Sequence, residues 1–303
     1  MLSRYMVDYT KKRVLLLDRQ GIPLFDPKSI RLGGGPLYHP VLTIQYGLAH
    51  HDRALDGDRG AEEIFLTCAR WVEEHASEEA LGRFLVWPYA FPLRTPPVRP
   101  PWISGMAQGQ ALSLLTRAFQ ETQSTRTAEV ARRAARSFCY SIREGGVVSV
   151  TNSGAFFIEE VAHAPAIHIL NGCLYGLFGL YEYLQVFDDA DLQPVLEKCL
   201  EGVDEVLPLF DMGWWSSYSL GLRWNVATHY YHDVHIRQLK HLAVLLDRPQ
   251  FDLYAQRWEA YRESSALRLR RTVHGVVEVN VNRVLTVAKL DRIKYRRVRA
   301  LDS

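Results

Sequence analysis

Three histidines, His229, His232 and His235, stand close together at the start of a segment with helical periodicity. In a helix, His232 and His235 lie one turn apart on the same face. Two imidazoles at that spacing can share a metal ion. The four cysteines add no support, because they are far apart, form no CxxC pair and lie in apolar segments typical of buried reduced thiols. On spacing alone, a metal at this run of histidines stays an open alternative.

Aromatic side chains are a second resource for chemistry, with 15 Tyr, 12 Phe and 7 Trp. Their faces suit stacking on sugar rings, but they suit a large core equally well. Several gather with prolines between Phe84 and Pro101, which excludes a helix there and predicts a long structured loop. Loops of this kind often carry function. Glycines 33–35 lack the flanking pattern of a phosphate loop and are interpreted as a flexible connection.

The composition excludes several classes of protein. The chain has 303 residues, of which 48% are hydrophobic and 23% charged, as in globular proteins with a large core. A net charge of +2 gives no strong field for nucleic acid, so no nucleic-acid partner is expected. No stretch approaches the ~20 apolar residues that span a bilayer, and the first 18 residues lack a secretory h-region. We therefore expect a cytoplasmic protein without a membrane span.

The elements that must position any site are mainly helical. Between Ala61 and His75, the apolar residues recur on one helical face. Further helices are expected at 40–51, 104–120, 127–142, 169–187, 192–207, 232–246 and 251–267. A hairpin is expected from 145–150 and 155–160, and an extended segment at 214–220. Helix pairs separated by hairpins predict a mainly α fold, an incomplete α/α toroid, although a long bundle has the same periodicity.

The two ends of the chain differ from this body. Residues 1–35 are interpreted as an N-terminal strand and loop segment, and residues 36–268 as the toroid domain. Residues 269–303 are predicted to form a β-rich basic tail, because valines crowd the stretch from Arg271 to Lys289. The final basic run, Arg292–Arg299, is interpreted as a solvated end.

Four segments resemble the glucuronyl C5-epimerase family in order and spacing across roughly Tyr38 to Tyr261. The three stronger ones are Pro101–Gln110 (PWISGMAQGQ), Glu159-Glu160 with Leu170–Tyr181 (LNGCLYGLFGLY), and Trp215–Leu220 (WSSYSL) with His229–Leu239 (HYYHDVHIRQL). The weaker fourth combines Tyr38-His39-Pro40 with Gln45–Leu48. Each motif alone has low specificity, but the four in sequence are fairly specific.

The resemblance implies an α/α toroid with attached β elements that acts on uronic acid residues within a polysaccharide, without a nucleotide cofactor. It also explains two of the three histidines without a metal, so we expect neither metal nor cofactor. Because members of the family often dimerise, a homodimer is expected.

Epimerisation at C5 needs a base beside the carboxylate, an acid on the opposite face and stabilisation of an enolate-like charge. The resemblance carries the catalytic tyrosines to Tyr218 and Tyr231, and adds Glu160 and Asn171. The alternatives are structural: the two tyrosines could simply pack in the core, and Asn171 could be the N-cap of the helix that follows it. A tyrosine that acts as base needs a nearby cation to lower its pKa. Further substrate-binding candidates from the motifs are His235, Tyr38, Tyr46, Trp102 and Gln108.

The chain departs from the family pattern at two positions. Where the family has a tyrosine after the glutamate pair, Val161 stands here and cannot carry a proton. Gly221 takes the place of an expected arginine. One interpretation is that His163 replaces the missing proton carrier, and Arg223 or Arg237 the missing cation.

Three readings of function therefore remain. The leading one is an epimerase acting on glucuronic acid in a polysaccharide or oligosaccharide. The second is a polysaccharide lyase, which would reuse the same base, or a glycoside hydrolase, which would need two of Glu159, Glu160, Asp211 and Asp233. The third is a non-catalytic glycan-binding protein, which Val161 favours.

Overall fold

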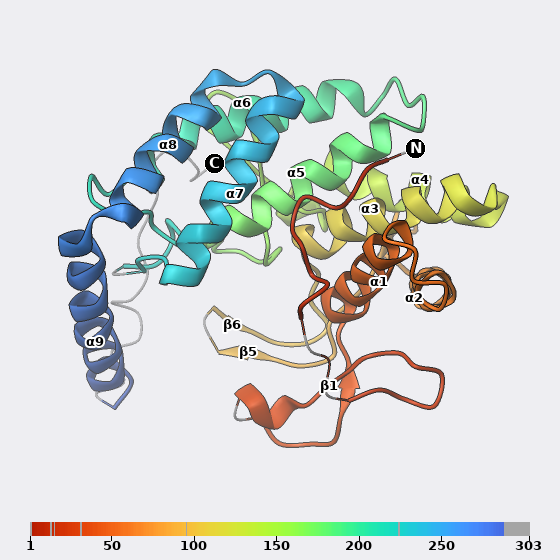
Figure 1. Cartoon of the computed structure of the whole chain (residues 1–303), viewed down its shortest axis with the longest axis horizontal. Helices are drawn as coiled ribbons and strands as arrows, with labels where there is room; N and C mark the ends of the chain where they lie inside the picture. Colours follow the sequence, from red (N-terminus) through yellow and green to blue (C-terminus); the bar gives the residue numbers. More distant parts are fainter. Residues whose placement is uncertain are drawn as a thin grey trace.

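A series of paired helices forms most of the molecule (Figure 1). The computed structural model describes residues 2–287, apart from positions 13, 15, 31, 95 and 224, and only the backbone of residues 282–287. The pairs are α1 (Pro40–Leu55) with α2 (Ala61–Glu74), α3 (Gly105–Thr122) with α4 (Thr125–Ala135), α5 (Leu170–Leu184) with α6 (Gln193–Phe210), and α7 (His229–Leu246) with α8 (Pro249–Glu263). The prediction of a mainly α-helical protein is confirmed.

The strands are short antiparallel pairs attached to the helices. They are β1 (Leu24–Phe25) with β2 (Leu37–Tyr38), β3 (Ser77–Glu78) with β4 (Leu85–Val86), β5 (Leu93–Arg94) with β6 (Pro97–Val98), and β7 (Val148–Val150) with β8 (Phe156–Ile158). Short 3₁₀ helices lie at Pro27–Ile30, Arg136–Cys139 and Ile142–Glu144. The expected hairpin before residue 160 is therefore present as β7–β8. Of the expected strand near residue 14, the described residues contain one bridge, between Leu17 and Pro23.

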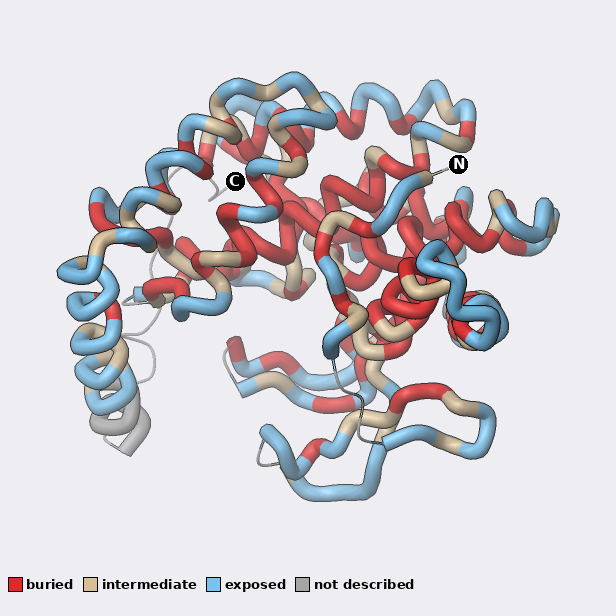
Figure 2. The backbone as a smooth tube through the Cα atoms, viewed as in Figure 1, coloured by how far each residue is buried: buried red, intermediate tan, exposed pale blue. Residues whose placement is uncertain are grey.

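Helices α3 and α5 form the centre of the core, where their backbones approach closely. A Cβ added to Gly109 would collide with the backbone of Gly176, and one added to Gly179 would collide with Gly109. These glycines belong to the sequence motifs, so part of the motif pattern serves close helix packing. Buried residues concentrate in this central layer, as Figure 2 shows.

The N-terminal segment crosses the helices and joins their core (Figure 1, dark red). Tyr5, Val7 and Tyr9 are all buried in the main hydrophobic cluster. The Tyr5 amide donates to Asp52 Oδ1 at 3.1 Å. The guanidinium of Arg117, itself paired with buried Glu182, donates to the carbonyl oxygen of Ser3. Residues 2–12 are thus fixed on the helical body, where they can contribute to a site.

The C-terminal prediction of a β-rich tail is wrong for the described residues. Ser265–Val287 form a helix, α9, that begins just after α8 ends. Val273, Val276 and Val277 recur at helical spacing. This spacing, together with the start of α9 directly after α8, outweighs the β propensity of valine. The basic run 292–299 lies outside the described residues. None of the described helices is long and apolar enough to cross a bilayer.

Four helices direct their N-terminal ends toward one place. His39 precedes α1, Ser104 precedes α3, Asn171 lies in the first turn of α5, and Tyr231 in the first turn of α7. Residues from all four ends line a single cavity. The first turn of each helix is rigid, so the side chains there are held in fixed directions. This convergence builds the candidate site.

Candidate active site

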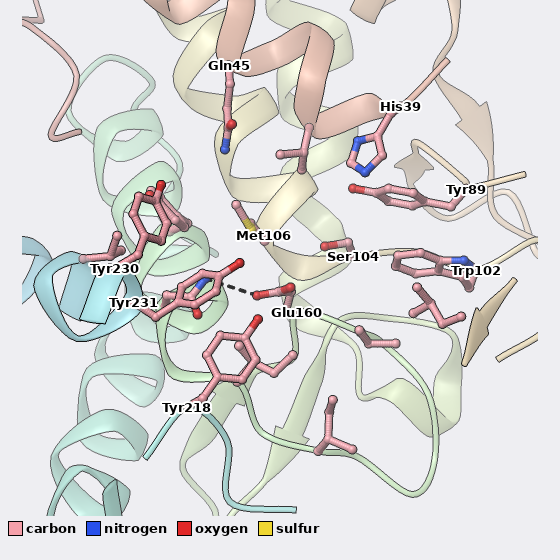
Figure 3. Close-up of a pocket in the computed structure, with 18 of the residues that line it drawn as sticks. His39, Gln45, Tyr89, Trp102, Ser104, Met106, Glu160, Tyr218, Tyr230 and Tyr231 are labelled. Atoms are coloured by element: carbon pink, nitrogen blue, oxygen red, sulfur yellow. Dashed lines mark hydrogen bonds between the residues drawn. The ribbon is translucent and has the colours of Figure 1, made fainter. Parts of the chain in front are cut away.

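The cavity has a volume of about 420 Å³, large enough for a sugar residue. Figure 3 shows the side chains that point into it from α1, α3, the β8–α5 connection and α7. Tyrosines dominate the wall, with Tyr9, Tyr89, Tyr175, Tyr218, Tyr230 and Tyr231 among the lining residues. The pocket therefore offers hydroxyl groups and aromatic faces together, a combination that suits a saccharide.

Tyr218 and Tyr231 form a pair on one side of the pocket. Their ring centroids are 4.6 Å apart and their planes meet at 54°. The two hydroxyl groups also interact, which raises the pKa of Tyr218 and lowers that of Tyr231. Burial is the larger influence on each, followed by the Glu160 carboxylate, so the pKa of both phenols lies above its usual range. Both tyrosines are therefore proton donors at neutral pH.

The pair is held by the loop between α6 and α7. The Tyr218 amide donates to the carbonyl oxygen of Asn225 at 2.8 Å, and the Tyr218 carbonyl accepts from the Leu170 amide at 3.2 Å. Thr228 caps α7, since its side-chain oxygen accepts from the Tyr231 amide at 3.2 Å. The extended segment expected at 214–220 thus fixes Tyr218 against the start of α5.

Glu160 is the carboxyl group of the pocket. It follows β8, and the Asn171 Nδ2 donates to its Oε2 at 3.4 Å (Figure 3, dashed line). Burial raises its pKa to about 7, against the smaller opposing effect of the Asn171 hydrogen bond. Figure 3 shows the Glu160 carboxyl facing the hydroxyls of Tyr218 and Tyr231. A carboxyl with a pKa near neutrality can both accept and donate a proton under ordinary conditions.

The neighbouring acid, Glu159, has a separate structural role. It is fully buried, and its Oε1 accepts from His168 Nδ1 and from Ser149 Oγ, each at 2.5 Å. Its Oε2 accepts from the His168 amide at 3.2 Å. Glu159 therefore anchors the loop that leads to α5, while Glu160, one residue later, faces the cavity.

Aromatic rings close the opposite side of the pocket. Trp102 stacks on Tyr89 at 3.9 Å between ring centroids, and its Nε1 donates to the carbonyl oxygen of Phe91 at 2.7 Å. His39 caps α1 through its Nδ1 and packs edge-on against Tyr89 at 5.0 Å. Burial, with the nearby Lys12 charge, lowers the pKa of His39 to about 4, so its imidazole is neutral.

Sequence reasoning missed several lining residues, above all Lys12, His39 and Gln45. Gln45 lies in the weak fourth motif, but the neighbouring Tyr46 was expected in the site. Helix α1 instead turns Gln45 into the pocket and leaves the Tyr46 ring against His50, 4.2 Å away. The rotation of α1 about its axis, relative to the other helices, decides which of two adjacent residues faces the pocket. The local sequence does not reveal that rotation.

The structure brings four of the expected site residues together. Glu160, Asn171, Tyr218 and Tyr231 all line the cavity, and Trp102 lines it at the opposite wall. Val161 lines it too, which leaves an apolar patch where the family pattern has a tyrosine.

His163 does not join this group. It lines a second hollow of about 650 Å³, on the other side of Trp102, together with Arg99, Ala162 and the turn at Gly145. The chain turns away from the first cavity after Val161, and the His163 amide donates to the Val161 carbonyl. The expectation that His163 stands in for the missing proton carrier beside the tyrosines is therefore corrected.

Two of the other expected residues are internal supports. Gln108 is fully buried, and its Nε2 donates to Leu85 and to Ser137 rather than to the cavity. His235 is also fully buried, with Nδ1 3.0 Å from Ser216 Oγ, and burial lowers its pKa to about 3. Their positions on α3 and α7 point them into the core, so the expected contact with substrate is corrected.

The remaining expected residues lie elsewhere. Tyr38 donates its hydroxyl to Asp18 at 2.7 Å and lines another hollow, beside Trp71. Arg223 and Arg237 are exposed and do not line the cavity. The cation expected beside the tyrosines is thus not supplied by either arginine, in agreement with the raised pKa of both phenols.

The run of histidines does not converge on one point. His232 and His235 both contact Ser216 Oγ, whereas His229 Nε2 lies 3.3 Å from Thr272 Oγ1. The other nitrogen of His232 lies 2.9 Å from the Trp258 carbonyl oxygen. In the part of the chain that the structure describes, no three His, Cys, Asp or Glu residues group so as to hold a metal ion.

Comparison with known proteins agrees with the family resemblance of the sequence motifs. The family described as D-glucuronyl C5-epimerase C-terminus matches residues 82–260. A D-glucuronyl C5-epimerase of Caenorhabditis elegans is 34% identical over 183 residues, which cover 54% of this chain and 29% of that protein. An uncharacterized protein of Methanocaldococcus jannaschii is 25% identical over 184 residues, 59% of this chain and 58% of that protein. The matches thus span less than two thirds of either relative.

A solved structure described as UGL with dGlcA-Glc-Rha-Glc has a similar fold. The TM-score is 0.50 at 15% sequence identity, and the likeness covers 77% of this chain and 62% of the other. At this identity the likeness concerns the fold alone. The family match, by contrast, includes Glu160, Asn171, Tyr218 and Tyr231 but ends before α9 and begins after α2.

Proposed function

We propose, from the premise that this chain belongs to the D-glucuronyl C5-epimerase C-terminus family, that it inverts C5 of glucuronic acid residues in a polysaccharide or oligosaccharide. One observation carries the proposal: Glu160, with a pKa of about 7, faces the paired phenols of Tyr218 and Tyr231 in a cavity of sugar size. No other carboxyl group of the described residues lines that cavity.

The chemistry divides between the carboxyl and the phenols. Glu160, once ionised, accepts the proton from C5, because its pKa matches neutral conditions. Tyr218 or Tyr231, which stay protonated, return a proton to C5 from the other side of the ring. This reverses the expectation of a tyrosine base, since burial raises the tyrosine pKa values and no arginine among the described residues lowers them. Asn171 orients the Glu160 carboxyl through its amide.

The loss of the family tyrosine is compatible with this division. Val161 lines the cavity but carries no proton. Two phenols and one carboxyl remain. Two-sided proton transfer requires two proton carriers, so these three groups are sufficient. An incomplete α/α toroid is the proposed arrangement of the helix pairs, supported by the fold likeness with a TM-score of 0.50. The homodimer remains a prediction.

A lyase is the second candidate, because elimination begins with the same loss of the C5 proton and a phenol could protonate the leaving oxygen. A hydrolase has less support. Of its four candidate acids only Glu160 lines the cavity, whereas Asp211 pairs with Arg257 and Asp233 with Arg262. Glycosidases need two carboxyl groups at the scissile bond. Glu159, the neighbouring candidate for the second carboxyl group, pairs with His168.

The test is incubation with heparosan, and with a glucuronic-acid oligosaccharide, in D₂O, followed by NMR of the C5 position. Deuterium at C5 without chain cleavage is the expected result. Glu160→Gln should abolish exchange, while His163→Ala, which alters only the second hollow, should leave it unchanged. An unsaturated product would show that the protein is a lyase and not an epimerase. No exchange on either substrate would contradict both enzymes and favour a glycan-binding protein.

A further inference from the structure

The cavity has a second polar region, formed by Lys12, Gln45 and Tyr9. The Lys12 ammonium donates to Gln45 Oε1 at 2.6 Å. The Gln45 Nε2 donates to the Tyr9 hydroxyl at 3.1 Å and to Gln110 Oε1 at 3.2 Å, and the Gln110 Nε2 donates to the same hydroxyl at 3.0 Å. Gln45, Tyr9 and Gln110 are buried, so this network fixes the amide oxygen that receives the ammonium.

Lys12 brings a charge that no carboxylate of the described residues balances. It is the one lysine or arginine among the described residues that line the cavity. No carboxylate in the described part of the chain forms an ion pair with it. The Lys12 side chain is exposed at the surface, but the surrounding protein excludes part of the water around its ammonium, which lowers its pKa. An ammonium that has a single amide acceptor, reduced contact with water and no counter-charge is a favourable place for an anion.

The region lies apart from the reacting groups. Figure 3 shows Gln45 reaching down from α1 on the side of the pocket away from Tyr218 and Glu160. Only the Asn171 hydrogen bond opposes burial in setting the Glu160 pKa, so the Lys12 charge leaves Glu160 unaffected. His39, which does lie within reach of the Lys12 charge, is held neutral and does not compete for an anion.

We propose that Lys12, held by Gln45, binds an anionic substituent of the saccharide, a carboxylate or a sulfate, and so positions the sugar against Glu160 and the tyrosine pair. The proposal rests on the proposed function for the reacting end of the cavity. It adds a residue from the N-terminal segment, outside the matched range 82–260, and thereby a reason for that segment to cross the helices. A salt bridge with the bound anion would offset the unfavourable effect of the surrounding protein on the charged ammonium.

The test compares the binding of three probes by isothermal titration calorimetry. They are a heparosan oligosaccharide, the same oligosaccharide with its carboxyl groups reduced to alcohols, and the reduced form after O-sulfation. The wild-type chain should prefer the first or the third over the neutral second probe, and the preferred one identifies the anion. Lys12→Met should reduce that preference about ten- to hundredfold, the range for one charge-assisted hydrogen bond. Lys12→Arg should retain most of it.

Lys11→Met is the matched control, because Lys11 is also exposed but does not line the cavity. It should leave the preference unchanged. Equal binding of anionic and neutral probes by the wild-type chain would overturn the proposal, as would an equal loss of affinity for all probes in Lys12→Met. Deuterium exchange at C5 is read separately: preference for anions without exchange would contradict the proposed function and leave the role of Lys12 standing.

Discussion

Gly172 leaves the space that the Glu160 side chain occupies. A Cβ at position 172 would collide with Cβ, Cγ and Oε2 of Glu160. Gly172 lies in the first turn of α5, directly after Asn171, which holds the Glu160 carboxyl. One short stretch of helix therefore both admits and orients the group to which we assign proton abstraction.

Gly172→Ala should displace Glu160 and lower C5 exchange by at least tenfold. In an ordinary helix position, glycine to alanine stabilises by roughly 0.5–1 kcal/mol. Here we expect a net loss of about 1–3 kcal/mol from overpacking, because the colliding atoms include the Glu160 Cβ, which cannot rotate away. Thermal unfolding and the exchange assay measure the two effects. Gly35→Ala, where a Cβ meets open space, is the control and should change neither.

The raised pKa of Glu160 predicts a dependence of stability on pH. Its pKa is about 7 in the folded chain and near 4.5 when exposed, so the folded state binds the extra proton between these values. Stability therefore falls as pH rises from about 4.5 to 7. Glu160→Gln removes the ionisation, keeps an oxygen for Asn171, and should raise the free energy of unfolding by about 1–3 kcal/mol at pH 8. At pH 4 the two proteins should unfold alike in urea; a constant difference at both pH values would contradict this.

The same ionisation should govern activity. If Glu160 is the base, the exchange rate rises with pH, is half-maximal near pH 7 and levels off at higher pH as the carboxylate becomes fully formed. Loss of activity should follow only where the phenols begin to ionise, above their usual range. A rate profile of C5 deuterium incorporation from pH 5 to 9 measures this. A rate that falls between pH 6 and 8 would exclude Glu160 as the base.

The two tyrosines should act as a unit. Tyr218→Phe and Tyr231→Phe each remove a proton donor and should slow exchange by about 10²- to 10⁴-fold. Because their hydroxyls interact, the double variant should lose less than the product of the two single losses. Tyr46→Phe, on α1 but outside the cavity, is the control and should leave the rate unchanged. Strictly multiplicative losses would mean that the two phenols act independently.

Gln108 should affect stability but not the affinity for a saccharide. Its buried amide donates to Leu85 and Ser137, and removing it leaves these acceptors without that donor. Gln108→Met, of similar size, should therefore cost about 1–3 kcal/mol in urea unfolding. Calorimetry on the folded variant should give wild-type affinity for the heparosan oligosaccharide. Weakened binding with unchanged stability would instead support the contact with substrate that the motif suggested.

Periodicity and turn residues predicted the helices and the β7–β8 hairpin, because these depend on local spacing. The same reasoning erred at the C-terminal valines. Valine favours strands on average, yet Val273, Val276 and Val277 continue a helix that starts beside α8. Intrinsic preference is a weak guide where a neighbouring helix already sets the direction of the chain.

Site residues could be predicted where a family motif specifies the position. They could not be predicted where two adjacent residues have the same chemistry and only one of them faces the cavity. Glu159 and Glu160 have the same chemistry, and only the path of the chain after β8 turns one toward His168 and the other toward the tyrosines. His163 lies three residues further along and already lines another hollow. Lys12 is about thirty residues from Gln45 in sequence, so their hydrogen bond depends on tertiary packing alone.

The meeting of four helix N-termini at the cavity has an electrostatic consequence. Each N-terminus carries the equivalent of roughly half a positive charge, and none of α1, α3, α5 or α7 has an acidic residue in its first turn. Helix α5 also lacks a capping side chain, and its first amide, that of Leu170, donates instead to the Tyr218 carbonyl oxygen. In the proposed reaction, loss of the C5 proton spreads negative charge onto the sugar carboxylate. The helix dipoles would then stabilise that charge without any side chain having to move.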